Sequence, residues 1–143
     1  MAVVLCEFQD VKMKPGTKER MEELFFSTGK LATGSVTEYY KEVSNGKVAF
    51  TGEVFGPYQL SQNLSYYTNN GKESFSKVSR VALTNSEYGW NEQGPNARNM
   101  ADEAFEAVKK ESYGKDWKVY DNDANGYVDA FICVHAGPAV SFW

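Results

Sequence analysis

Apolar and polar residues alternate along the chain in patterns that predict three strands. Val3–Phe8 is a nearly continuous apolar run, typical of a strand covered on both faces. Lys47–Val54 alternates apolar and polar residues like a half-covered strand, and Gly56-Pro57 then predicts a turn. Tyr127–Val134 is rich in apolar and β-branched residues and predicts a buried strand.

Two helices are predicted between the first two strands. Thr17 can cap the first, and Gly29 ends it. Ser35 and Glu38 have the spacing of a capping box, in which each side chain satisfies a backbone donor of the other, and therefore mark the start of the second. The apolar positions are Met21, Leu24 and Phe25 in the first helix and Val36, Tyr39, Tyr40 and Val43 in the second.

The clearest helix follows Asn96, which can act as its N-cap, and closes before Gly114. Its predicted buried stripe consists of Met100, Ala101, Ala104, Phe105 and Val108. The order of strands and helices predicts an α/β (α+β) domain, a twisted mixed sheet backed by helices. The 143 residues are expected to form a single domain, 1–143, that can bury a substantial core.

The segment 60–94 is polar and irregular, with Val78–Leu83 as its one mildly strand-like stretch. A connection of this length is expected to fold on itself, to present a functional surface or to be mobile. It carries aromatic residues that could bind a sugar or a peptide, or else pack the segment onto the body of the protein. These aromatic residues are Tyr66, Tyr67, Tyr88 and Trp90. Asn63 lies in the one glycosylation sequon, which matters if the protein is secreted.

Charge and hydropathy exclude two classes of partner. The formal net charge is −4 and the pI about 5.1, which disfavours a nucleic-acid partner. No apolar run approaches the ~20 residues that a membrane helix requires. The chain as written enters its first strand directly and has no signal peptide.

The stretch before the last strand carries the most specific chemistry. Oxygen-bearing residues recur at every second position: Asp121, Asp123, Asn125, Tyr127 through its carbonyl, and Asp129. Gly126 allows a sharp turn among them, and calcium takes six to eight oxygen ligands, so the spacing predicts a Ca²⁺ site. The alternative is an Asx-rich turn without an ion. Ile132 stands where an EF-hand has its bidentate Glu, so further ligands must come from elsewhere.

The remaining candidate residues favour structural roles. Cys6 and Cys133 lie in predicted core strands, where a buried free Cys behaves as a small hydrophobe, although a bridge between them stays open. His135 is the only histidine, which disfavours a Ser or Cys nucleophile that needs a neighbouring base.

Several segments, in order, resemble the N-terminal part of the M6 metallopeptidases, the immune-inhibitor-A-like secreted proteases. The segments are Phe25–Ser27, Thr33–Val36, Glu38–Lys47, Thr51–Tyr58, Pro95–Arg98, Tyr120–Phe131 and His135–Pro138. The resemblance implies the N-terminal subdomain of a zincin protease and a secreted location. In that family a later helix bears His-Glu-x-x-His, whose histidines hold the catalytic zinc.

This chain departs from the family at that point. It contains no His-Glu-x-x-His, and one histidine with two distant thiols does not supply the three or four ligands of zinc. We therefore expect no Zn²⁺ in this chain, a structural role for His135, and no catalytic residues for the family's mechanism. The apolar ending, Val140–Trp143, differs from the family's continuation and is expected to be a real terminus.

The sequence thus favours a non-catalytic, calcium-stabilised, secreted M6-like protein that binds carbohydrate or protein. One alternative is an N-terminal fragment or subunit of an active zinc protease, whose zinc half lies outside this chain. Another is an unrelated activity on the same scaffold. The sequence leaves open whether copies of the chain associate.

Overall fold

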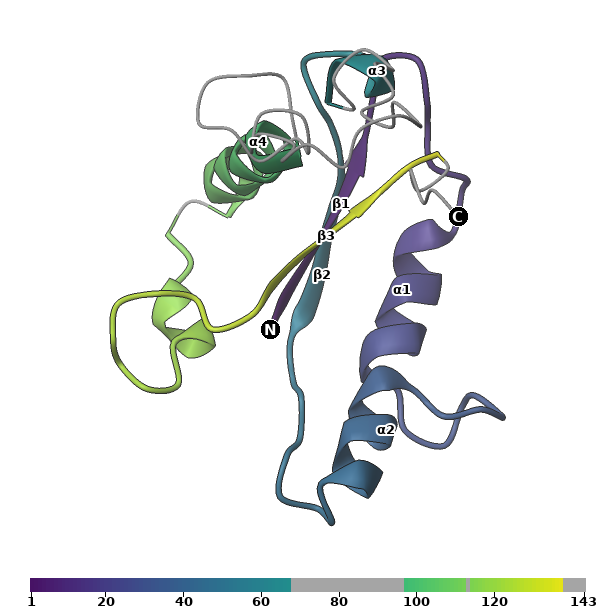
Figure 1. The fold of residues 1–143 in the computed structure, drawn as a ribbon, viewed down its shortest axis with the longest axis vertical. Coiled ribbons are helices and arrows are strands. Elements are labelled where there is room, and N and C mark those ends of the chain that lie inside the picture. Colours follow the sequence, from purple (N-terminus) through teal and green to yellow (C-terminus); the bar gives the residue numbers. More distant parts are fainter. Residues whose placement is uncertain (68–96, 113, 138–143) are drawn as a thin grey trace, which may run out of the picture.

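The computed structural model describes residues 1–67, 97–112 and 114–137 (Figure 1). The expected Val78–Leu83 strand, Tyr88, Trp90 and the Val140–Trp143 ending lie outside these ranges. No helix among the described residues is long and apolar enough to cross a membrane.

Three parallel strands form the sheet, in the order β2-β1-β3. They are β1 (Ala2–Glu7), β2 (Glu53–Gln59) and β3 (Phe131–His135). The α/β class expected from the sequence is confirmed, and all strand pairs in the described part of the chain are parallel. The last strand begins four residues later than predicted, because 127–130 still belong to the acidic loop.

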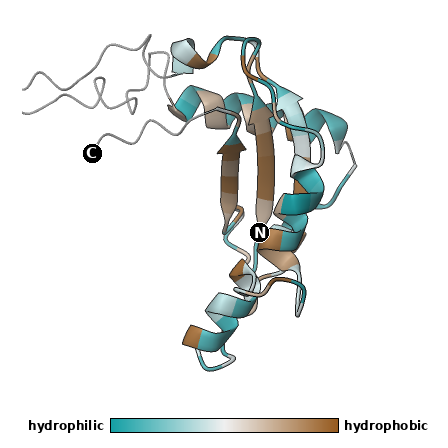
Figure 2. Cartoon of the chain, turned by 90° about the vertical axis from the view of Figure 1, so that its right-hand side faces the viewer, coloured by the Kyte–Doolittle hydropathy of each residue, from teal (hydrophilic) through white to brown (hydrophobic). Residues whose placement is uncertain are grey.

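The middle strand β1 is buried on both faces, as its continuous apolar run predicts. On one face, Val4 and Cys6 pack against Ala104 and Val108 of α4 (Ala97–Glu111). On the other face, Val3 and Leu5 belong to the layer that α1 (Thr17–Phe26) covers with its Met21, Phe25 and Phe26 side chains. Figure 1 shows these two helices on opposite sides of the sheet, and Figure 2 shows the strongest apolar colour in β1 and β3.

The connection into β2 differs from the sequence prediction. Residues 47–52 are irregular, and Gly56-Pro57, predicted as a turn, lies inside β2 with a cis peptide bond. The register between β1 and β2 shifts at this level, between Val4 and Cys6. A Cβ atom on Gly56 would meet the Leu5 carbonyl oxygen at 2.6 Å, so the glycine permits a close approach of two strands that no local pattern reveals.

The first two helices begin as predicted and end or pack differently. Thr17 starts α1, but its hydroxyl donates to the Lys14 carbonyl instead of capping the helix, and α1 ends at Phe26, before Gly29. In α2 (Val36–Val43) the capping box of Ser35 and Glu38 is confirmed. The apolar face of α2 remains largely exposed, with Tyr39, Tyr40 and Val43 among the exposed large apolar residues.

The third helix buries the centre of its predicted stripe. Ala104 and Val108 of α4 are fully buried, and Met100 packs on the same core from a half-buried position. Asn96, the expected N-cap, lies outside the described residues. Two short helices complete the described fold, α3 (Leu64–Tyr67) after β2 and the 3₁₀ helix η2 (Trp117–Tyr120) before the acidic loop.

Because β1 is buried on both faces, truncating one of its core side chains should destabilise the protein. Leu5→Ala removes a side chain that is 0% exposed, and should lower the free energy of unfolding by about 2–5 kcal/mol through lost burial and a cavity. Leu24→Ala on α1, where the side chain is 41% exposed, is the matched control and should change it by about 0.5 kcal/mol or less. Urea unfolding followed by circular dichroism measures both, and equal losses would contradict this packing.

Candidate metal centre and ligand surface

The acidic loop between η2 and β3 brings three carboxylates together. Asp121, Asp123 and Asp129 each place one carboxylate oxygen within 4.8 Å of the others. Ala124 and Gly126 have left-handed φ angles of 57° and 89°, which fold the loop back on itself. Three aspartates on so short a loop are the oxygen-rich donor set that calcium prefers.

Hydrogen bonds from donors of the same loop hold the carboxylates of Asp121 and Asp123. Asp121 accepts from the backbone N–H groups of Asn125 (3.0 Å) and Gly126 (2.9 Å), one on each carboxylate oxygen. Asp123 accepts from the backbone N–H of Asn125 at 3.2 Å and from its side-chain amide at 2.9 Å. These are the bonds of an Asx-rich turn, and a carboxylate with about four lone-pair sites still keeps sites for a cation.

Asp129 closes the loop from its far end. Its Oδ2 accepts from the Asn122 backbone N–H (2.7 Å) and the Asn122 side-chain amide (2.6 Å). The backbone bond, then the side-chain bond, and the charge of the Met1 ammonium group lower the pKa of Asp129. In the described part of the chain, no Lys or Arg forms an ion pair with any of the three aspartates.

The other predicted ligands lie in the same loop. The Asn125 Oδ1 accepts from the Tyr127 backbone N–H at 2.9 Å, and the Tyr127 side chain is 77% exposed. Ile132, at the position of the EF-hand glutamate, packs in the apolar layer beneath α1. The loop therefore contributes no ligand at that position, as the sequence predicts.

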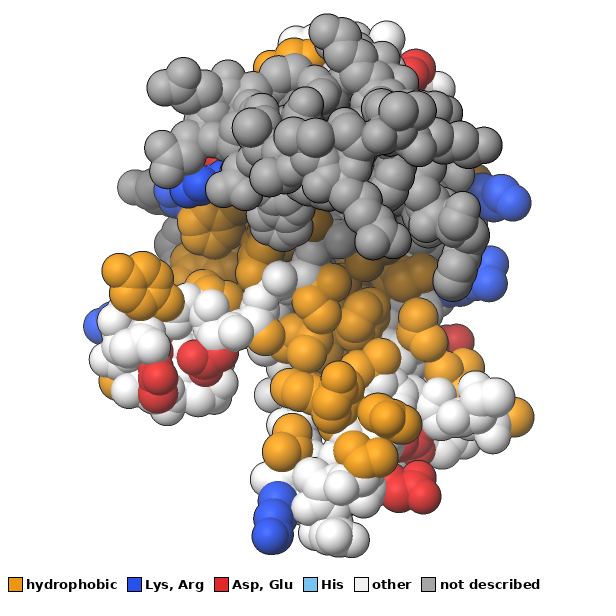
Figure 3. All heavy atoms as spheres, in the orientation of Figure 1, with side chains coloured by type: hydrophobic (Ala, Val, Ile, Leu, Met, Phe, Trp, Pro, Cys, Tyr) orange, Lys and Arg blue, Asp and Glu red, His pale blue; other side chains and the backbone are white. Residues whose placement is uncertain are grey.

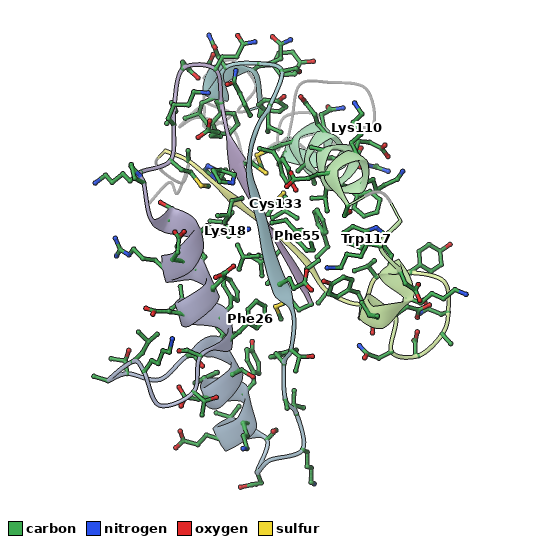
Figure 4. The ribbon with its side chains drawn as sticks, turned by 180° about the vertical axis from the view of Figure 1, so that it is seen from behind. Lys18, Phe26, Phe55, Lys110, Trp117 and Cys133 are labelled. Atoms are coloured by element: carbon green, nitrogen blue, oxygen red, sulfur yellow. The ribbon has the colours of Figure 1, made fainter. Side chains whose placement is uncertain are left out.

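A lysine anchors the base of the loop to the sheet. Lys115 pairs with Glu53 at the start of β2, and its Nζ lies 4.9 Å from the centre of the Phe55 ring. Phe55 also packs against Trp117 of η2 at 5.7 Å, and Figure 4 shows these two rings side by side. The Asp129 N–H then donates to the Tyr120 carbonyl at 2.9 Å, so the loop is fixed at both ends.

The predicted ligand-binding aromatics divide into two environments. Tyr66 is exposed, whereas Tyr67 is 4% exposed and packs the segment onto the core, which is the second of the two alternatives given for these rings. The Tyr67 hydroxyl donates to Glu103 of α4, and burial followed by this bond raises the pKa of Tyr67 to about 12. The Tyr66 ring stands edge-on to Tyr67 at 5.1 Å, so the exposed ring rests on a fixed base.

Glu103 is a residue that the sequence pattern missed. Its carboxylate also accepts from the Ser61 N–H (2.5 Å) and the Ser61 hydroxyl (3.1 Å), and so ties the end of β2 to α4. In the helical pattern of the sequence, Glu103 occupies an ordinary polar position, and its partners come from a distant part of the chain. Asn63, in the sequon, is exposed beside this cluster.

His135 and the two cysteines lie in strands of the sheet. His135 is half-buried, with its Nδ1 2.9 Å from the Ala136 carbonyl oxygen and its ring against Phe8. Cys6 and Cys133 are free thiols with Sγ atoms 3.7 Å apart. The hydrogen bond between the two thiols, followed by the burial of Cys6, raises the pKa of Cys6. In the described ranges, these residues belong to no cluster of three metal-ligating side chains.

The lowered pKa of Asp129 predicts a change in acid stability. A carboxylate whose pKa is lowered by folding stabilises the folded state at pH values above its pKa in the unfolded chain, 3.8. This stabilisation is lost as the pH falls through the pKa of the carboxylate in the folded protein. Asp129→Asn should therefore flatten the dependence of Tm on pH below about pH 4, measured by calorimetry with a chelator present. Asp102→Asn, an exposed position on α4, is the control and should keep the wild-type slope.

Comparison with known proteins agrees with the resemblance noted in the sequence. The family described as immune inhibitor A peptidase M6, catalytic domain, matches residues 5–141. No curated protein and no solved structure matches the chain. The match spans both core layers and the acidic loop. The chain therefore belongs to the M6 peptidase family.

Proposed function

We propose that this chain is a non-catalytic, calcium-stabilised member of the M6 family that is secreted and acts by binding carbohydrate or protein. The observation that carries the proposal is the pairing of two features. The sequence has one histidine and no His-Glu-x-x-His, while three aspartates of the described chain converge within 4.8 Å. The chain lacks the histidines that would hold the family's catalytic zinc, but its three aspartates offer the oxygen ligands that a hard cation takes.

Calcium would act on the acidic loop as a stabilising charge. Asp121, Asp123 and Asp129 would hold it, with Asn125 and the Tyr127 carbonyl as further oxygen donors of the same loop. Three carboxylates this close repel one another, and a divalent cation replaces that repulsion by attraction. Because Lys115 and Tyr120 fix the loop to β2, ordering the loop would stabilise the sheet as well.

The proposed ligand surface centres on α3. The exposed Tyr66 ring is supported by the buried Tyr67, and Tyr67 is held by Glu103, so the platform is rigid. Aromatic rings with a fixed orientation bind sugars and peptides at a low cost in conformational entropy. Secretion rests on membership of the family, and the exposed sequon at Asn63 is compatible with it.

A second function is favoured by the apolar surface of α2. Tyr39 and Val43 are 59% and 57% exposed, although they lie on the apolar face of the helix. An exposed apolar face marks an interaction surface. It supports the alternative in which the chain is the N-terminal part or subunit of a working zinc protease and another segment covers this helix.

Calcium should raise the thermal stability of the protein. At a free concentration 100 times Kd, binding adds about 2.7 kcal/mol, which corresponds to a rise in Tm of about 5–10 °C. Asp121→Asn and Asp123→Asn should abolish the rise, whereas Asp102→Asn on α4 should retain it. Differential scanning fluorimetry with calcium and with chelator measures this, and an equal rise in all variants would place calcium elsewhere.

Binding without hydrolysis separates the two functions. Purified chain should give a glycan-array or peptide-array signal that Tyr66→Ala reduces roughly tenfold, within the range of ring stacking of ~1–2 kcal/mol. Tyr39→Ala on α2 is the control and should leave the signal unchanged. Casein hydrolysis by the pure chain, abolished by a zinc chelator, would overturn the non-catalytic proposal.

A further inference from the structure

The two cysteines of the sequence meet inside the sheet. Cys6 lies near the start of the chain and Cys133 near its end, yet β1 and β3 are neighbouring strands and bring the two Sγ atoms to 3.7 Å. Both side chains belong to the apolar layer that Ala104 and Val108 of α4 complete. The sequence contains no third cysteine, so this contact joins all of its thiols. Neither the metal centre nor the ligand surface uses them.

The two thiols have different environments. Cys6 is fully buried, whereas Cys133 is half-buried. The hydrogen bond from Cys6 lowers the pKa of Cys133, although burial opposes this effect, and the same bond followed by burial raises the pKa of Cys6. The thiolate is the reactive form of cysteine. An oxidant should therefore react first with Cys133.

We propose that Cys6 and Cys133 form a reversible redox switch, in which hydrogen peroxide oxidises Cys133 and Cys6 then closes a disulfide within the chain. The Cys133 sulfur donates an electron pair to one peroxide oxygen, so that an S–O bond forms and the O–O bond breaks. The departing hydroxide takes up the proton that Cys133 has lost and leaves as water. A sulfenic acid remains on Cys133.

The second step uses the contact between the sulfurs. The Cys6 sulfur attacks the Cys133 sulfur, the S–O bond breaks, and the oxygen leaves as water with the Cys6 proton. Two thiols and one hydrogen peroxide thus become one disulfide and two waters. A sulfenic acid condenses with a neighbouring thiol, and the sensor cysteines of other proteins often have such a resolving thiol beside them. The 3.7 Å contact therefore favours the disulfide over further oxidation of Cys133.

The strand register makes the disulfide reducible. Cys133 pairs with Val4, and Cys6 pairs with His135, so the two cysteines are offset by two residues along the strands. This offset is about 6.6 Å of strand, in addition to the ~4.8 Å between strands, whereas disulfides prefer Cα atoms ~5.5–6 Å apart. Closing the bridge therefore requires the backbones of β1 and β3 to move, and a bridge closed in this way is readily reduced.

Peroxide treatment of the folded, full chain tests the switch. After treatment, alkylation and digestion, mass spectrometry should find the peptides of Cys6 and Cys133 joined, and a non-reducing gel should show a single chain. Dithiothreitol in native buffer should restore both thiols. Thiols that survive peroxide, a bridge between two chains, or a bridge that opens only in denaturant would overturn the proposal.

Two matched variants test the order of the steps. Cys6→Ser keeps a hydrogen-bond donor beside Cys133 but removes the resolving thiol, so dimedone should trap a sulfenic acid on Cys133. Cys133→Ser leaves the buried Cys6 as its one thiol, which should survive the same treatment. Circular dichroism confirms that both variants are folded. Equal loss of thiol in the two variants would refute the assigned roles. These readouts are independent of calcium, ligand binding and proteolysis.

Discussion

The burial of β1 on both faces is the constraint from which the rest of the structure follows. Its alternate side chains enter two separate apolar layers, Val3 and Leu5 toward α1, Val4 and Cys6 toward α4. A strand without a polar face has to lie in the middle of a sheet, and its two neighbours are added on either side. The helices that connect them then cover opposite faces, which is the arrangement of a doubly wound α/β domain.

This arrangement places the acidic loop where it can influence the sheet without belonging to its core. The loop enters at the amino end of β3 and is held through Lys115 to the start of β2, on the other side of β1. Asp123 and Asp129 are exposed and Asp121 is half-buried, and backbone N–H groups satisfy part of the hydrogen-bonding capacity of Asp121 and Asp129. A cation bound there would compensate the remaining charge, and metal affinity and sheet stability would then be coupled through the same few contacts.

This member of the M6 family exposes part of its apolar surface in the described ranges (Figure 3). The apolar face of α2 is largely exposed, and no described strand pairs with the outer edge of β3. Both are sites where a protein gains free energy by adding a partner. An exposed apolar helix face is compatible with the binding role that we propose.

The sequence determined the local features. The sequence predicted the apolar run of β1, the capping box of Ser35 and Glu38, and the oxygen-bearing residues at every second position from Asp121 to Asp129, because each feature depends on residues close along the chain. The tertiary structure alone decided the position of Gly56-Pro57 within β2 and the burial of Tyr67 against Glu103. Each of these depends on which distant backbone or side chain comes close. Such contacts are fixed by packing and strand register, which no local periodicity encodes.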